Sequence, residues 1–258
     1  MVKGLYAAYS GMINEQNRMD VLTNNLANAS TTGFKKEGAT SQAFKDVLAY
    51  KIKDTTDYPH LAKNIGNLNL GVKVGETYTD YSQGAFKATE NTYDLALSGS
   101  GFFMVEFANK NGENTIKYTR DGSFTLNKDG YLVTKDGDYV LDSRQRRIKV
   151  DPNEDSAIDT AGRIQQNGVT VATIGITDFE DYNYLEHYGE NYYEPVPGAK
   201  VTAPNALIRS GYLEASNVQV VSEMVEMISV SRQYESNQKL IQTIDSTLEI
   251  ASNRLGKV

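Results

Sequence analysis

The sequence predicts an α+β protein in which long N- and C-terminal helices, packed as a coiled-coil-like pair, flank a central and mostly antiparallel β domain. Both ends of the chain carry apolar residues at alternating steps of three and four, which is the spacing of one narrow face of a helix. The region between them changes to short runs rich in β-branched and aromatic residues, separated by Asp-Gly pairs typical of tight turns.

We expect the N-terminal helix within residues 1–34. Glu15 is the one misfit in its apolar seam, and the helix is expected to stop at residues 30–33, where Gly33 can adopt the left-handed conformation that ends helices. The seam residues predicted to form an assembly interface are Leu5, Met12, Met19, Leu22 and Leu26.

The C-terminal helix is expected within residues 211–258. Ser216 is the predicted N-cap, with Gln219 at the capping-box position. A helix over residues 218–255 is roughly 57 Å long at about 1.5 Å per residue. Its seam also contains Glu223 and Ala251, and the residues predicted to form the assembly interface are Val220, Met227, Val230, Tyr234, Asn237, Ile241, Ile244, Leu248 and Leu255.

Residues 218–230 carry more apolar side chains than one neighbouring helix can bury, because Val221, Met224, Val225 and Ile228 lie outside the seam. Each apolar side chain left in water forgoes roughly 1.5–3 kcal/mol of burial. Several neighbours are therefore expected to pack around this segment and bury its apolar side chains. The alternative is an ordinary pair of amphipathic helices that lie on their own domain.

Asn237 is a polar residue between Tyr234 and Ile241 in this seam. A single seam Asn in a coiled coil can fix the register and the number of strands at some loss of stability. The alternative is a slight rotation of the helix that leaves Asn237 exposed.

Residues 35–75 match neither period well, and we expect an extended linker in which Phe44, Val47, Leu48 and Ile52 form a short helix. Residues 76–210 are expected to form the β-rich outer domain. Strands are predicted at 94–97 and 102–107 around a turn at 98–101, then as a meander at 123–126, 131–134 and 138–141, and again at 168–172 and 172–177.

Composition excludes several classes of protein. The formal charge of −7 and the pI near 5.0 argue against a nucleic-acid partner. No run approaches the roughly 20 apolar residues of a membrane span, and the first residues are too polar for a secretory signal. The absence of cysteine excludes disulfides and thiolate chemistry.

No catalytic constellation emerges, and we expect no catalytic residue, cofactor or metal. His60 and His187 lack companion motifs, and the acids at Asp121, Asp129, Asp136 and Asp138 do not match a calcium loop. Asp-Gly pairs are explained by tight turns. The acidic, tyrosine-rich stretch 178–194 is equally well explained as a carbohydrate surface, a partner surface or an exposed sheet face.

Three parts of the chain resemble the flagellar basal-body rod and hook proteins of bacteria. The matching runs are LTNNLANASTTGFK at 22–35, DLAL at 94–97, GSGFF at 99–103, YTRDGSF at 118–124, GYLEASNV at 211–218, EMV at 223–225, RQYESN at 232–237 and TID at 243–245. The signature residues are Asn24, Asn25, Asn28, Gly33, Phe34, Gly99, Gly101, Phe102, Phe103, Glu214 and Asn217.

The resemblance implies a structural subunit of the drive shaft, without enzymatic activity, whose terminal helices form an inner tube inside an outer β domain and transmit torque. It implies copies of the chain, other rod and hook subunits, the type III export apparatus and the surrounding bushing rings as partners. It also implies a basal body in the periplasm and cell envelope, reached unfolded and without a cleaved signal peptide.

Within this family the length of 258 residues favours the distal rod protein, or the closely related proximal-rod subunit that carries a β domain. The alternative function is a binding module or enzyme whose β domain carries the activity and whose helices dimerise it. A further alternative is a secreted, adhesin-like surface protein.

Overall fold

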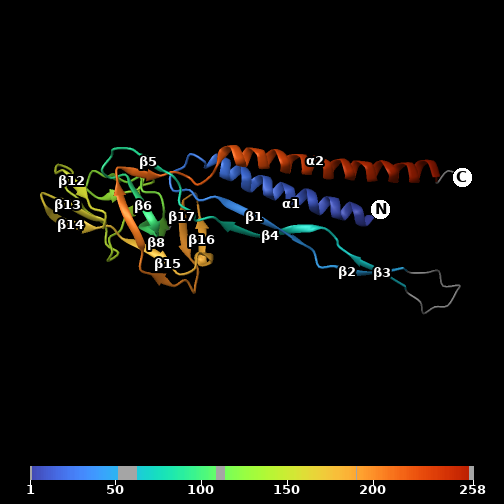
Figure 1. Ribbon diagram of the computed structural model, residues 1–258, viewed down its shortest axis with the longest axis horizontal. Helices are drawn as coiled ribbons and strands as arrows, with labels where there is room; N and C mark the ends of the chain where they lie inside the picture. Colours follow the sequence, from blue (N-terminus) through green and yellow to red (C-terminus); the bar gives the residue numbers. More distant parts are fainter. Residues whose placement is uncertain (1, 52–62, 109–113, 190, 256–258) are drawn as a thin grey trace. The chain divides into compact units, whose positions relative to one another are not determined.

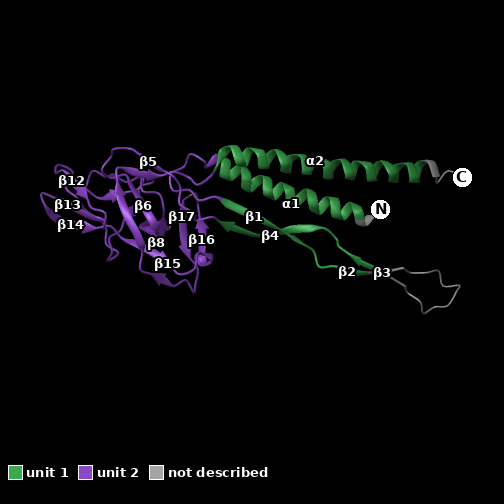
Figure 2. Ribbon diagram, viewed as in Figure 1, with its two compact units in different colours: residues 1–26, 37–79, 219–258 green, residues 27–36, 80–218 purple. Residues whose placement is uncertain are grey.

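The computed structural model describes residues 2–51, 63–108, 114–189 and 191–255, and Figure 1 labels its elements. The chain divides into two compact units (Figure 2). Unit 1 comprises residues 1–26, 37–79 and 219–258, and unit 2 comprises residues 27–36 and 80–218. Unit 1 contains two long helices and a β arm, whereas unit 2 is a β domain. The α+β class is therefore confirmed.

Helix α1 (Val2–Ala27) is the expected N-terminal helix, and its predicted seam faces away from solvent. Leu22 is buried and the other four predicted seam residues are half-buried, while Glu15 is buried in spite of its charge. The helix ends at Ala27, before residues 30–33. Gly33 does have a positive φ of 71°, but it lies beyond the end of the helix.

Helix α2 (Val220–Ile250) continues as a π-helical turn at Ala251–Leu255. The predicted N-cap at Ser216 is wrong, because Gln219 occupies the cap position and makes no side-chain cap bond. The Ser216 hydroxyl instead accepts a hydrogen bond from the N–H of Val218 at 3.2 Å, which forms a local turn before the helix. The first helical bond runs from the N–H of Glu223 to the carbonyl of Gln219 at 3.0 Å.

Between Glu223 and Ile244, every seam residue of α2 is buried or half-buried. Val220 and Leu248 are exposed members of the predicted seam, and the side chain of Leu255 lies outside the described residues. The buried and half-buried side chains of α2 are Glu223, Met227, Val230, Ser231, Tyr234, Asn237, Ile241 and Ile244.

Helices α1 and α2 lie side by side within unit 1 (Figure 1). Arg18 donates to Glu226 at 3.1 Å. The side chain of Asn237 lies against Gly11, where an added Cβ would be 3.0 Å from its amide nitrogen. Asn237 is therefore half-buried against α1. Continuous coiled-coil packing along the whole length of both helices stays a prediction.

The predicted linker over residues 35–75 is wrong, because the described part of this segment is a two-stranded arm. Strand β1 (Glu37–Ala43) pairs with β4 (Val72–Thr79), and β2 (Val47–Lys51) pairs with β3 (Lys63–Leu68), both antiparallel. The predicted short helix is excluded by the pairing of β2, since its backbone bonds go to β3. Ile52 lies outside the described residues.

In the described residues of unit 2, all strand pairs are antiparallel. Its main sheet has the order β16-β17-β8-β7-β11-β10-β9, with β15 also pairing with β7 and β18 with β15. Smaller sheets are β12-β13-β14, β19-β6 and β20-β5. A 3-10 turn spans Tyr182–Tyr184. The strands are β5 (Phe86–Ala88), β6 (Leu95–Ser100), β7 (Phe102–Ala108), β8 (Asn114–Thr119), β9 (Thr125–Leu126), β10 (Leu132–Val133), β11 (Tyr139–Val140), β12 (Ser156–Ile158), β13 (Arg163–Gln166), β14 (Val169–Thr173), β15 (Ile176–Phe179), β16 (Leu185–Tyr188), β17 (Tyr192–Pro195), β18 (Val201–Thr202), β19 (Asn205–Ser210) and β20 (Tyr212–Glu214).

The predicted meander is confirmed as β9, β10 and β11, and the turns at Gly130 and Gly137 have positive φ values of 81° and 96°. The predicted hairpin turn at residues 98–101 is wrong. Strand β6 runs through Ser100 and pairs with β19, whereas β7 pairs with β8, β11 and β15. The glycines there allow close strand contact, because a Cβ at Gly99 would collide with the carbonyl of Asn205.

Two apolar clusters fill unit 2. The larger one lies between the main sheet and the smaller sheets, and the second is rich in aromatic rings. In the second cluster the Tyr182 hydroxyl donates to Asp178 at 2.7 Å, and burial raises the pKa of Tyr182 to about 12, with the Asp178 bond acting in the same direction. The buried members of the larger cluster are Leu95, Leu97, Phe103, Val105, Phe124, Leu132, Val140, Ile148, Val150, Ile164, Ile174 and Ile208, and those of the second are Phe102, Met104, Tyr118, Leu141, Phe179, Leu185 and Tyr193.

Tyr182 predicts a loss of stability in alkali. Its pKa is higher in the folded protein than in the unfolded chain. The contribution of Tyr182 to the free energy of unfolding is therefore complete below the ordinary tyrosine pKa of about 10, and it is lost as the pH rises through about 12. Urea unfolding of Tyr182→Phe should therefore show a shallower fall in unfolding free energy across this window, while Tyr184→Phe should behave like the wild type. An unchanged slope in Tyr182→Phe would contradict the assignment.

Candidate functional site

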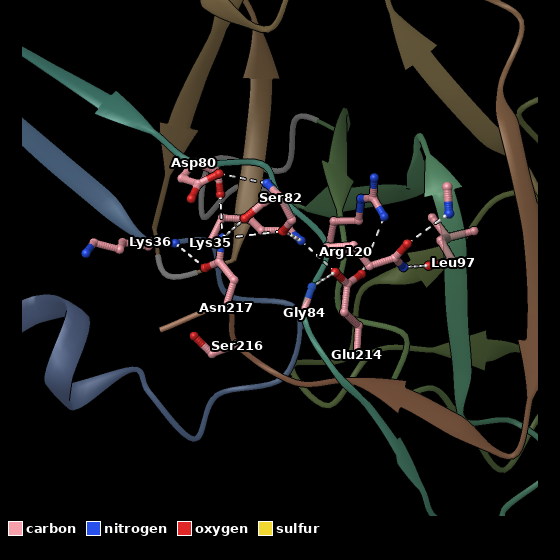
Figure 3. Close-up of polar contacts among 12 residues, drawn as sticks. Lys35, Lys36, Asp80, Ser82, Gly84, Leu97, Arg120, Glu214, Ser216 and Asn217 are labelled. Carbon is pink, nitrogen blue, oxygen red and sulfur yellow. Dashed lines mark hydrogen bonds and ion pairs between the residues drawn. The ribbon is translucent and has the colours of Figure 1, made fainter. Parts of the chain in front are cut away.

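Residues from distant parts of unit 2 meet at the carboxylate of the signature residue Glu214, at the end of β20 (Figure 3). Lys35 donates its ammonium to Glu214 Oε1 at 2.6 Å, and the N–H of Gly84 donates to the same oxygen at 2.9 Å. Arg120 donates to Oε2 at 3.4 Å. The three charged residues retain only 1–3% of their exposure, so solvent does not screen these charges.

This buried cluster carries two positive charges and one negative charge. Lys35 also donates to the carbonyl of Ser82 at 2.8 Å, and the Arg120 guanidinium lies 5.3 Å from the centre of the Phe102 ring. Burial lowers the pKa of Lys35; the neighbouring Glu214 carboxylate opposes this effect and the charge of Arg120 adds to it. The Glu214 carboxylate therefore offsets part of the cost of burying each cation.

Gly33 brings the chain that follows α1 against the β domain. Its N–H donates to the carbonyl of Glu214 at 2.8 Å, and its φ of 71° is left-handed. A Cβ at this position would lie 2.5 Å from the carbonyl carbon of Arg120, so a larger residue has no space. The neighbouring Thr32 hydroxyl donates to Asp121 at 2.8 Å. Gly33 is thus required both by conformation and by close backbone approach.

Asn217 joins three segments of unit 2 with one side chain. Its Oδ1 accepts the N–H of Lys36 at 2.7 Å, and its Nδ2 donates to the carbonyl of Asp80 at 2.8 Å and to the Ser82 hydroxyl at 3.0 Å. These segments adjoin the positions at which the chain passes between the units, at 36/37, 79/80 and 218/219. The cluster and Asn217 therefore fasten the connecting segments to the β domain.

Asn25 performs a similar role inside unit 1. Its Oδ1 accepts the N–H of Glu37 at 2.9 Å and its Nδ2 donates to the carbonyl of the same residue at 2.7 Å, as a paired strand residue would. The Nδ2 also donates to Glu223 Oε2 at 3.3 Å. Both Asn25 and Glu223 are buried. One amide therefore joins α1, β1 and α2.

The remaining signature residues are structural. Asn28 accepts a hydrogen bond from the Thr31 hydroxyl at 3.2 Å in the turn after α1, and Asn24 is an exposed residue of α1. Gly99 and Gly101 have positive φ values of 116° and 139°. The buried aromatic residues of the signature are Phe34, Phe102 and Phe103.

Lys35 and Arg120 lie inside the resembling runs, but they were not predicted as site residues. Both are remote from Glu214 in sequence, so no local pattern indicates these ion pairs.

His187 lies in β16 against the Tyr193 ring, and His60 lies outside the described residues. In the part of the chain that the structure describes, no three His, Asp or Glu residues are grouped to hold a metal ion.

The arrangement identifies the class of protein: its signature side chains Asn25, Glu214 and Asn217 bind backbone groups and neighbouring charged side chains, as in a structural protein. Comparison with known families agrees. Residues 5–35 match the flagella basal body rod protein family, residues 96–171 the flagellar hook protein FlgE/F/G D1 domain, and residues 209–254 the flagellar basal body rod FlgEFG protein C-terminal family. Neither α1 nor α2, as far as each is described, is long and apolar enough to cross a membrane.

Full-length relatives show the same relationship. The chain is 35% identical to the flagellar basal-body rod protein FlgG of Bacillus subtilis over 272 residues, covering 96% of this chain and 97% of the relative. It is 36% identical to the rod protein FlgF of Caulobacter vibrioides over 266 residues, and 32% identical to the hook-basal body complex protein FlhO of Bacillus subtilis over 272 residues, each covering 100% of both chains. The chain belongs to the flagellar basal-body rod protein family, and it is a structural rod subunit, not an enzyme.

The buried charge cluster predicts a large effect of removing one charge. Glu214→Gln keeps the shape of the side chain but leaves Lys35 and Arg120 buried without a counter-charge, which should lower the free energy of unfolding by about 3–5 kcal/mol. Chemical denaturation measures this loss. The matched control is Glu180→Gln, which removes an exposed pair with Lys200 and should cost about 0–1 kcal/mol. Equal losses in the two variants would contradict the importance of the cluster.

Proposed function

We propose that the subunit assembles axially with copies of itself through α1 and α2, that unit 2 forms the outer wall of the rod, and that the assembled helices transmit torque. The observation that carries this proposal is a second apolar face on α2. Val221, Met224, Val225 and Ile228 retain 76%, 47%, 63% and 55% of their exposure, although the seam residues between Glu223 and Ile244 are buried or half-buried.

An exposed apolar face of this size indicates a partner. Each of these side chains forgoes roughly 1.5–3 kcal/mol while it is in water, and contiguous apolar patches on soluble proteins mark sites of association. One helix that shields one face and presents another suits packing within a subunit and between subunits. The alternative binding module or enzyme, dimerised by its helices, has no support from the comparisons.

Further partners follow from the family resemblance. We infer that the chain also contacts other rod and hook subunits and the surrounding bushing rings. We infer that the type III export apparatus delivers it unfolded to the basal body in the cell envelope, without cleavage of a signal peptide. The length of 258 residues favours the distal rod protein over the proximal-rod subunit with a β domain.

Deletion of the gene tests the function directly. A strain without this subunit should lack complete flagella and fail to swim, since a rod with a missing segment cannot carry a hook. Electron microscopy of basal bodies and a soft-agar swimming assay measure both effects, and a plasmid copy of the wild-type gene should restore them. A deletion strain that builds normal flagella and swims would refute the proposal.

Asn237→Leu tests whether this amide sets the register of the helices. The apolar replacement should strengthen helix association, because it removes a polar group half-buried against Gly11, but it should also permit wrong registers. We expect mis-assembled subunits and reduced swimming, while the free energy of unfolding of unit 2 stays unchanged. Gln238→Leu, the same change at an exposed position, is the control. Normal swimming of Asn237→Leu would show that another residue sets the register.

A further inference from the structure

An apolar groove lies within unit 1 between α1 and the β arm. Its volume is about 840 Å³. Its apolar lining includes Tyr6, Tyr9 and Ile13 from α1 and Phe44 and Leu70 from the arm, and all five of these side chains are exposed. The groove therefore presents apolar walls from two elements and, within the described residues, is not filled by another part of the chain.

The walls of the groove are fixed to each other. The N–H of Val72 donates to the Ser10 hydroxyl at 3.3 Å, and Asn14 donates to the Ser41 hydroxyl at 3.0 Å. Gly71 has a φ of 124°, and a Cβ there would collide with the Ser10 hydroxyl. The arm backbone can approach α1 this closely only because residue 71 is glycine. The groove is thus a built feature of unit 1.

The exposed face of α2 has the pattern of a helix that binds in such a groove. Val221, Met224, Val225 and Ile228 stand at positions i, i+3, i+4 and i+7, the anchor spacing of helix-in-groove recognition. The stripe from Val221 to Ile228 is about 10.5 Å long, and the wall from Tyr6 to Ile13 also spans seven steps and has the same length.

We propose that the groove of one copy binds this outer face of α2 from a second copy of the chain. This inference rests on the proposed assembly function and names the two surfaces that meet. The two surfaces agree in polarity. The four residues of the outer stripe are uncharged, and among the described residues Lys73 is the one charged residue that lines the groove. An apolar stripe therefore meets a mainly apolar lining.

The occupant comes from another copy because α2 already contacts α1 of its own copy through its opposite face. Glu223 bonds Asn25, and Asn237 lies against Gly11, so the seam is occupied within the subunit. Two different surfaces that meet between copies form a heterologous contact, which leaves one free surface of each kind at the two ends. Such a contact generates an open helical polymer when its rotation does not close into a ring, and a rod requires this open form.

Cysteine cross-linking tests the contact, because the chain has no cysteine of its own. Tyr9→Cys and Val225→Cys are placed in two differently tagged full-length copies that are produced together in a swimming strain. Oxidation should join the two tags in one disulfide-linked heterodimer, since a disulfide requires Cα atoms about 4.4–6.8 Å apart. The control pair is Tyr9→Cys with Gln238→Cys, on another face of α2, and its yield should be several-fold lower.

Equal yields in the two pairs, a disulfide mainly between two Val225→Cys copies, or a cross-link mainly to a different protein would overturn the inference.

A charge introduced into the groove provides a second measurement. Phe44→Asp should abolish swimming while the free energy of unfolding of unit 2 stays unchanged. Gln42→Asp, two residues earlier in β1 and outside the groove lining, should swim. A swimming Phe44→Asp strain would overturn this contact but leave the rod function intact, because only the deletion strain tests that function.

Discussion

The buried carboxylate of Glu214 is the interaction on which the organisation of the chain depends. It pairs with both Lys35 and Arg120, and burying either cation without it would cost several kcal/mol. Its two partners lie 179 and 94 positions away along the chain. The cluster is therefore complete only when the segment after α1, the β domain and the segment before α2 are all in place, which couples their folding.

The amide residues extend this coupling. Asn217 in unit 2 and Asn25 in unit 1 each bond to backbone groups of segments that are separated from them in the sequence. An amide can donate and accept simultaneously, so it can replace a strand partner where the backbone leaves a sheet. The signature residues therefore identify the places where the chain passes between helices and sheets. This explains why they include none of the apolar seam residues, whose exact identity matters less than their volume.

The sequence predicted those features that repeat locally. The α2 seam from Glu223 to Ile244 could be predicted because burial follows the helical period, and the meander because Gly130 and Gly137 need positive φ. The arm could not be predicted in this way, since β1 and β4 are exposed over most of both faces and lack strict alternation. The Glu214 cluster was missed as a site because it depends on pairs that are remote in sequence, and sequence spacing contains no information on such contacts.

The two faces of α2 differ in polarity. The seam includes Glu223, which is bonded to Asn25 of α1 and favours one arrangement of the helices within a subunit. It also includes Asn237, which lies against Gly11. The outer stripe of Val221, Met224, Val225 and Ile228 is purely apolar, and its attraction is non-directional. In the proposed assembly, polar contacts would therefore define the arrangement within a subunit, whereas cohesion between subunits would depend on buried area.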